Sequence, residues 1–446
     1  GNIVWEASSS LDYSASSGNL TLDASGYIQL NSDITTGTGG LTLKAGAGFV
    51  EAAAGITLNL GGALEIGTGD SRPGLPALAA TLTGSGGLFK SGSGRLILSG
   101  NNSSWTGNTL VEQGSLRATS ANALGSASFP TKVATGATLE LSGGITVPEP
   151  IDLAGGTLVS LSGDNTLTNR ILLLESSVVE VQQDSLTLNP SSGNAVAVDP
   201  ASTAFNSNFT LAGDGDLVVQ APLDLQDGHA TPTYGDFRQT GAGVARFQDT
   251  LFVERVEAVG GGTLWMDQPP QSPVVTGPVI SAFFLDNGSL LRRDGNETVT
   301  DTSLELGAGG GGISVGDGFT LVWDAPISGS GDFSKEGEGT LRFPATADVS
   351  YTGATLVKAG ELDVVSTEPA SATCSGTGTS NRCPQPVLET PPVADDEPLD
   401  DEVAVLVEAV AEVPVFPPAE QRAQDEASTD PLADQSDRDH SAVSAG

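Results

Sequence analysis

Residues 84–96 read GSGGLFKSGSGRL, and residues 329–341 read GSGDFSKEGEGTL. The two stretches share four glycines, one lysine and the final leucine, and the similarity continues to Leu116 and Leu362. A weaker third copy occupies residues 235–266. Short strands that are punctuated by glycine and repeated along a chain indicate a solenoid, in which each unit buries its apolar side against its neighbours.

A shorter period runs through the first 66 residues. Leu-Thr-Leu at residues 20–22 recurs at residues 41–43, and Ile34 recurs as Ile56. A period of about 21 residues suits one coil of a parallel β-helix that contains two or three strands. We therefore predict an all-β chain, a right-handed parallel β-helix (β-solenoid), with the handedness taken from the general rule for parallel crossovers. At this period, some 365 residues give about 17 coils.

The composition fits many short strands joined by tight turns. The chain has 446 residues, of which 58 are Gly and 16% are charged, and its formal net charge is -37. Such a surface repels phosphate backbones and anionic lipids, so we expect no nucleic-acid partner. Acidity of this size also keeps a long β structure soluble, and cation capture is the alternative explanation.

The repeat ends near Thr367, and we predict three regions. Residues 1–366 form the parallel β-helix shaft, with strand repeats at 84–119, 235–266 and 329–365. Residues 367–390 form a cysteine-loop segment, and residues 391–446 form an acidic, Pro-rich, disordered tail, because low hydrophobicity with like charges opposes folding. The candidate partner-binding residues are apolar positions inside this tail, namely Val403, Val405, Leu406, Val407 and Val410.

The chain contains no apolar run of eighteen or more residues, so the sequence predicts no transmembrane helix. It begins in the middle of a coil pattern, and we expect it to be the C-terminal piece of a longer protein. Its two cysteines, Cys374 and Cys383, lie close together outside the repeats. One close pair without other thiols suits an oxidising compartment.

Two parts of the chain resemble known secreted proteins. Residues 5–64 resemble the β-helical shaft of filamentous-haemagglutinin-type exoproteins, and residues 84–116 resemble the strand repeat of autotransporter passengers. Such proteins are secreted across the outer membrane of Gram-negative bacteria and act in adhesion, aggregation or biofilm formation. The resemblance implies the C-terminal region of a large secreted surface adhesin, located at the cell surface or outer membrane. It implies no enzymatic activity and no cofactor, and a host receptor or an extracellular polysaccharide as the binding partner.

The resemblance leaves the secretion route open. In two-partner secretion the partner is a separate outer-membrane transporter barrel, and some adhesins of that route resemble this chain in having a close cysteine pair near the C-terminus. There the disulfide loop holds the last segment in the pore, which makes Cys374 and Cys383 a candidate disulfide anchor. A plain local staple is the alternative. Cross-linking a loop of about ten residues contributes only about 2.5–3 kcal/mol, so stabilising the whole fold is not an obvious purpose of the pair.

Two alternative identifications remain. The first is an autotransporter passenger domain that lacks its translocator barrel. The second is a polysaccharide-active β-helix enzyme, which would need two or three convergent carboxylates. Sparse charge along residues 1–366 disfavours the enzyme.

Motifs for catalysis and metal binding are scarce. The two histidines, His229 and His440, offer almost no material for a Ser-His-Asp site. Gly-Asp-Ser at residues 69–71 resembles a serine-protease signature, but the Arg-Pro-Gly that follows predicts a turn. Gly-Asp-Gly turns at residues 213–216 and 316–318 raise the possibility of calcium. The pattern is not iterated, however, so local backbone hydrogen bonding is the favoured reading.

Aromatic residues on one flank of a solenoid are candidates for stacking on sugars. The candidates are Trp5, Trp105, Trp265, Trp323 and Tyr351. Tyr351 occupies the same repeat position as Trp105. We expect an aromatic residue at a repeated position to be packed at a corner of the coil instead of facing a ligand.

Overall fold

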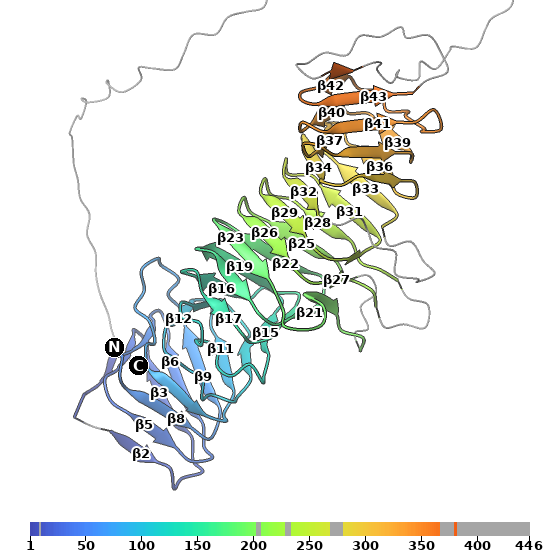
Figure 1. The fold of residues 1–446 in the computed structure, drawn as a ribbon. Helices are drawn as coiled ribbons and strands as arrows, with labels where there is room; N and C mark the ends of the chain where they lie inside the picture. Colours follow the sequence, from blue (N-terminus) through green and yellow to red (C-terminus); the bar gives the residue numbers. More distant parts are fainter. Residues whose placement is uncertain (9, 202–206, 228–232, 268–279, 366–378, 381–446) are drawn as a thin grey trace, which may run out of the picture. The chain divides into compact units, whose positions relative to one another are not determined.

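The computed structural model describes residues 1–8, 10–201, 207–227, 233–267, 280–365 and 379–380 (Figure 1). Strands and turns make up these ranges, and the strands are stacked coil upon coil. Each strand pairs in parallel with the strand one coil further along, as Leu20–Ala24 does with Leu41–Ala45. The predicted parallel β-helix is therefore confirmed. Nowhere in these ranges does a helix occur that could cross a membrane.

Each complete coil contributes one strand to each of three faces. Strands of the first face are β1 (Ile3–Trp5), β4 (Ile28–Leu30), β7 (Val50–Ala52), β12 (Arg95–Leu98), β14 (Ser115–Ala118), β16 (Thr138–Ser142), β19 (Thr157–Ser162), β22 (Ser177–Val181), β25 (Phe209–Ala212), β28 (Phe237–Gln239), β31 (Arg255–Ala258), β33 (Ala282–Leu285), β36 (Ser303–Leu306) and β39 (Ile327–Gly329). Single bridges at Leu78 join β7 to β12.

The second face follows the first along each coil. Its strands are β2 (Leu11–Tyr13), β5 (Ile34–Thr36), β8 (Thr57–Leu60), β10 (Thr81–Gly84), β17 (Thr146–Val147), β20 (Asn165–Leu167), β23 (Ser185–Leu188), β26 (Asp216–Val219), β29 (Val244–Phe247), β32 (Thr263–Met266), β34 (Ser289–Arg293), β37 (Gly311–Val315), β40 (Phe333–Glu336) and β42 (Thr355–Val357). The first four strands and the last ten form separate sheets.

The third face completes the coil. Its strands are β3 (Leu20–Ala24), β6 (Leu41–Ala45), β9 (Leu64–Thr68), β11 (Leu88–Ser91), β13 (Thr109–Val111), β15 (Thr131–Ala134), β18 (Ile151–Ala154), β21 (Ile171–Glu175), β24 (Val196–Val198), β27 (Leu223–Asp224), β30 (Leu251–Phe252), β35 (Glu297–Val299), β38 (Thr320–Trp323), β41 (Thr340–Phe343), β43 (Glu361–Val364) and β44 (Thr379–Ser380). The first eleven of these strands form one sheet and the last five another.

The number of coils is smaller than the period of 21 residues predicts. On the first face, three strands, the single residue Leu78, eleven further strands and the single residue Val349 form one ladder of sixteen levels. The predicted spacing holds between Leu20 and Leu41. Between Leu223 and Leu251, however, one coil takes 28 residues. Longer corner loops lengthen such coils without adding strands, so the described residues form slightly fewer coils than the predicted number of about 17.

The core is built from side chains at alternate strand positions. Leu41, Leu64 and Leu88 stand in register on neighbouring coils, and all three are buried. Phe209 and Phe237 stack in the same way further along, with their ring centroids 5.7 Å apart. Each buried side chain of this size contributes on the order of 1.5–3 kcal/mol relative to its exposed state. The column of apolar side chains therefore holds the coils together.

Glycines permit close contact between coils at one corner. A Cβ atom on Gly86 would lie 1.8 Å from the carbonyl oxygen of Gly62, and one on Gly107 would lie 1.7 Å from that of Gly86. The second repeat has the same arrangement, in which a Cβ on Gly353 would lie 2.2 Å from the carbonyl oxygen of Gly331. The Thr-Gly dipeptide of the repeat is thus required because no side chain fits there.

The two strong copies of the repeat occupy different faces. In the first copy, β11 lies on the third face and β12 on the first. In the second copy, β40 lies on the second face and β41 on the third. The motif therefore specifies a strand, a corner and the next strand, and it is not tied to one side of the coil.

Candidate binding surface

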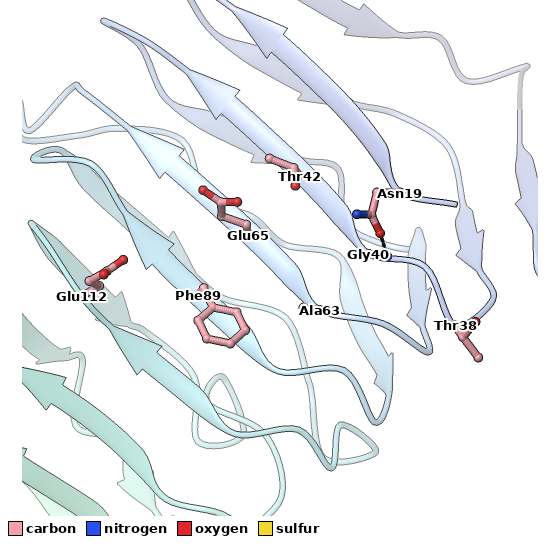
Figure 2. A pocket seen from close by; sticks show the side chains of 8 residues that line it. All are labelled: Asn19, Thr38, Gly40, Thr42, Ala63, Glu65, Phe89 and Glu112. Atoms are coloured by element: carbon pink, nitrogen blue, oxygen red, sulfur yellow. Dashed lines mark hydrogen bonds between the residues drawn. The ribbon is translucent and has the colours of Figure 1, made fainter. Parts of the chain in front are cut away.

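A hollow of about 530 Å³ opens on the outer side of the third face (Figure 2). It is lined by Asn19, Thr38, Gly40, Thr42, Ala63, Glu65, Phe89 and Glu112. We call these eight residues the Phe89 groove. They come from five successive coils, because β3, β6, β9, β11 and β13 are neighbours in one sheet. At about 4.8 Å per coil, the groove runs for about 20 Å along the solenoid.

Small residues form the floor of the Phe89 groove, directly before the strands β6 and β9 begin. Gly40 and Ala63 stand level with each other, because Leu41 pairs with Leu64. The Asn19 side chain closes one end, where its Oδ1 accepts a hydrogen bond of 2.8 Å from the Gly40 amide. A Cβ atom on Gly40 would lie 2.8 Å from the Ala63 carbonyl oxygen, so a side chain there would require the two coils to shift.

Phe89 forms the aromatic wall of the groove. Leu88 and Lys90 on either side of it are buried in the core, so strand alternation turns Phe89 outward and leaves it 41% exposed. Its ring atoms Cε2 and Cζ lie 3.4 and 3.7 Å from the place that a Cβ on Gly87 would take. The ring therefore lies beside Gly87, at a distance at which a Cβ there would be in ordinary van der Waals contact with it.

Two carboxylates lie on either side of Phe89. Glu65 is its register neighbour one coil before, and Glu112 directly follows the strand one coil after (Figure 2). The Oε1 of Glu65 lies 4.0 Å from Lys44 Nζ and 3.5 Å from Ser91 Oγ. Within the described ranges, no salt bridge engages Glu112. The groove thus combines one exposed apolar ring with acceptors for hydroxyl or amine donors.

The aromatic residues that were predicted from the sequence as candidates for stacking on sugars do not line the Phe89 groove. Trp105 and Tyr351 are each 2% exposed, so the expected packing of the aromatic residue at the repeated position is confirmed. Trp323, at the end of β38, is 0% exposed. The alternative, that these three rings form sugar platforms, is wrong, because their faces lie against the core. Trp5 is half-buried and also packs on the core.

Trp265 lies on the outer side of the second face with both ring faces covered. The Cζ atoms of Arg246 and Arg292 lie 4.0 and 3.9 Å from its ring centroid. Asp267 and Asp294 pair with these two guanidinium groups at 2.7 and 3.0 Å. Trp265 is thus part of a cation–π stack across three coils and presents no open face to a sugar.

Sequence reasoning overlooked Phe89 because the residue type alone does not reveal its direction. A signal was nevertheless present in the two copies of the repeat. When Lys90 is aligned with Lys335, Phe89 corresponds to Ser334 and the inward Leu88 to Phe333. An aromatic residue outside the core in one copy only is not demanded by the repeat itself.

The other predicted motifs are accounted for by backbone contacts. The Asp70 carboxylate accepts hydrogen bonds from the backbone amide and the guanidinium of Arg72, so Gly-Asp-Ser forms a turn as expected. Asp214 and Asp216 accept hydrogen bonds from the backbone amides of Ala242 and Val244 on the next coil, at 3.2 and 2.9 Å. In the described part of the chain, no three His, Cys, Asp or Glu side chains converge as metal ligands.

A second, smaller hollow of about 400 Å³ lies further along the third face. Burial raises the pKa of Asp224 in its wall, and Asn194 Nδ2 donates to that carboxylate at 3.3 Å. The Asp227 carboxylate accepts a hydrogen bond from the Thr233 amide at 3.0 Å. These contacts close the corner loop, and the hollow holds no exposed aromatic residue.

Several predicted residues lie outside the described ranges. They are His229, His440, Cys374, Cys383, Val403, Val405, Leu406, Val407 and Val410. The disulfide anchor, the partner-binding stretch and the disordered tail therefore stay predictions.

Two stretches of the chain match the passenger-associated-transport-repeat. They are residues 88–118 and 333–364, and we call them the transport repeats. The chain is also similar to the adhesin BmaC autotransporter of Brucella suis biovar 1 (strain 1330), with 29% identity over 417 aligned residues. This match covers 80% of the present chain and 11% of that protein, so the chain spans a small part of its relative. No solved structure matches the chain significantly.

The transport repeats and the relative together support an autotransporter-type β-helical passenger. They favour the alternative identification from the sequence over two-partner secretion. The filamentous-haemagglutinin-type identification, and the secretion partner that it implies, stay predictions.

Proposed function

We propose that this chain is a surface-displayed segment of an autotransporter-type adhesin of a Gram-negative bacterium. The observation that carries the proposal is the pair of transport repeats, which fold as coils of one parallel solenoid in a chain similar to a named adhesin. The role is binding at the cell surface, in adhesion, aggregation or biofilm formation, and it requires no cofactor.

The solenoid suits this role on physical grounds. Each coil contacts only its neighbours, so the stack can extend without a larger globular core. The outward positions are free of packing constraints and can carry binding groups on any of the three faces. The net charge of -37 opposes non-specific attachment to anionic surfaces, so adhesion requires specific contacts.

The test uses the full-length protein in its own bacterium. Cells that display the intact protein are compared with cells whose protein lacks residues 1–365, and the surface amount is measured with an N-terminal tag. Loss of adherence or aggregation at equal surface amount supports the proposal. Unchanged adherence at equal surface amount contradicts it.

A second measurement covers the case in which the shortened protein is not displayed. The purified 446-residue chain is added to wild-type cells as a soluble competitor. Concentration-dependent inhibition of adherence is expected if this segment carries binding groups. If inhibition does not occur at saturating concentration, this segment is not adhesive.

A further inference from the structure

We propose that the Phe89 groove binds a neutral glycan, with one sugar ring stacked on Phe89 and its hydroxyl groups donating to Glu65 and Glu112. This assignment rests on the proposed adhesive function and names its ligand class. Phe89 supplies the only aromatic wall of the groove, and the carboxylates stand one coil before and one coil after it.

Phe89 is not explained by folding. The second transport repeat forms the same strand with Ser334 at the equivalent position, and its inward neighbours Phe333 and Lys335 are buried as Leu88 and Lys90 are. An exposed phenyl ring loses the hydration benefit of a polar side chain without gaining a core contact. A ligand that covers the ring supplies the missing apolar contact.

Several other outward aromatic rings in the described ranges have a neighbour on them. Arg246 and Arg292 cover Trp265, Phe49 stacks on Tyr27 at 5.2 Å, and Arg255 lies over Phe284. Phe129 and Tyr13 are exposed to 40% and 38%, but neither of them lines the groove. Phe89 is thus an exposed ring that also faces a hollow.

The polar groups select the ligand class. Carboxylates accept strong hydrogen bonds from hydroxyl groups, and Thr38 and Thr42 add side-chain hydroxyls of their own. A pyranose ring offers an apolar C–H face for the phenyl ring and hydroxyls around its edge. The same carboxylates, in a chain of net charge -37, repel sulfated or uronic-acid glycans. A groove that crosses five coils suits an extended oligosaccharide of several units.

The second transport repeat lacks every element of this site. Ser334 replaces Phe89, Lys358 replaces Glu112, and Gly312 stands one coil before Ser334, where Glu65 precedes Phe89. Lys358 Nζ there pairs with Glu336 at 2.6 Å. The repeat therefore folds with either set of residues, and the groove is a feature of the first copy alone.

The experiment measures binding of the purified full chain to immobilised oligosaccharides. The neutral probes are hexasaccharides of β-1,4-glucose, β-1,4-N-acetylglucosamine, β-1,3-glucose and α-mannose. Hyaluronan and heparin fragments are the acidic probes, and oligolysine is the cationic probe. The variants are Phe89→Ser, which copies the second repeat, and Phe129→Ser, which removes an equally exposed ring outside the groove. Thermal unfolding of both variants confirms that they fold.

The expected result is binding to at least one neutral probe, little affected by salt. Phe89→Ser should weaken it at least about tenfold, equivalent to about 1.4 kcal/mol, and Phe129→Ser should leave it unchanged. Glu112→Lys should weaken the same binding. Absence of neutral-glycan binding, equal binding by wild type and Phe89→Ser, or salt-sensitive binding of oligolysine alone would each overturn the assignment.

The outcome is separable from that of the proposed function. If the soluble chain blocks bacterial adherence but binds no neutral probe, the chain is adhesive and the groove assignment fails. If the chain binds a neutral probe through Phe89 but does not affect adherence, the groove assignment stands and the adhesive function fails.

Discussion

Lys90 and Lys335 are buried at the same position of the two transport repeats, on different faces of the solenoid. Lys90 Nζ donates hydrogen bonds to the carbonyl oxygens of Ser91, Gly92 and Gln113 at 2.7, 2.8 and 3.1 Å. The first two carbonyls belong to its own corner, and the third belongs to the next coil. One ammonium group therefore ties two coils together.

Lys335 repeats this arrangement in the second copy. Its Nζ donates to the carbonyl oxygens of Glu336, Gly337 and Ala359 at 2.7, 2.7 and 3.1 Å. An ammonium group has three N–H donors, so three carbonyls satisfy it completely. Burial lowers the pKa of each lysine to about 8, which leaves the ammonium form dominant at neutral pH.

Replacing Lys90 with Met should destabilise the solenoid. The Met side chain preserves most of the apolar stem, but three carbonyls lose their donor, so we expect the free energy of unfolding to fall by about 2–4 kcal/mol. Lys335→Met should have a similar effect. The matched control is Lys44→Met, whose side chain is 49% exposed, with an expected change within about 0.5 kcal/mol. Urea denaturation at neutral pH measures the stability of all three variants. Equal denaturation midpoints for Lys90→Met and Lys44→Met would refute the stabilising role of the Lys90 ammonium group.

Gly107→Ala tests the close contact at the corner. Its Cβ would lie 1.7 Å from the Gly86 carbonyl oxygen, so the coils must separate, and we expect a loss of about 3 kcal/mol. Gly295→Ala is the control, because its Cβ would meet nothing within 4 Å. Thermal unfolding should show a lower midpoint for the first variant only. A normal midpoint for Gly107→Ala would mean that the coils can open there without cost.

Glu149 predicts an unusual dependence of stability on pH. It is 1% exposed between β17 and β18, and burial raises its pKa from 4.5 to about 7. The folded chain therefore holds this proton more tightly than the unfolded chain does. Stability should fall as the pH rises from 4.5 to about 7 and remain lower above that. The loss amounts to at most ~3 kcal/mol, at about 1.36 kcal/mol per pKa unit.

Glu149→Gln should remove this dependence. The variant is expected to be more stable than the wild type at about pH 8 and close to it at about pH 5, as measured by urea denaturation. Glu140→Gln is the contrasting control, because Glu140 accepts hydrogen bonds from Arg95 and Arg117 at 3.0 and 2.6 Å. That variant should lose stability at both pH values. If stability depends on pH equally in Glu149→Gln and in the wild type, the buried carboxyl group of Glu149 is not the cause of the dependence.

Cys374→Ala tests the predicted disulfide anchor in the full-length protein. If a loop closed by Cys374 and Cys383 retains the protein at the outer membrane, the variant should move from the cell fraction into the culture supernatant. Immunoblotting of both fractions for the solenoid measures the partition. A Ser380→Ala variant inside the same loop should stay with the cells. Identical partition of Cys374→Ala and wild type would leave a local staple as the remaining reading.

Much of the fold could be predicted because its determinants are local and repeated. Alternation of residues such as Leu41, Thr42 and Leu43 specifies which side chains enter the core, and stacking of equal coils makes the parallel pairing unavoidable. The glycines of the repeat predict the corners of the coils, because they too recur at fixed positions. The predicted number of coils was slightly too high because corner loops vary in length, and loop length changes neither the strands nor their pairing.

The sequence by itself determined the parallel solenoid, its acidic surface and the buried state of the aromatic residues at the repeated corner, Trp105 and Tyr351. Only the tertiary structure decided that Phe89 faces outward beside Glu65 and Glu112. Whether a side chain points inward or outward depends on which residue of the strand is the first to face the core. The corner before each strand decides this separately for every strand. Proximity across coils depends on a register that joins residues lying, for example, 19 or 32 positions apart. A binding surface on a solenoid is therefore assembled from positions that no continuous motif records.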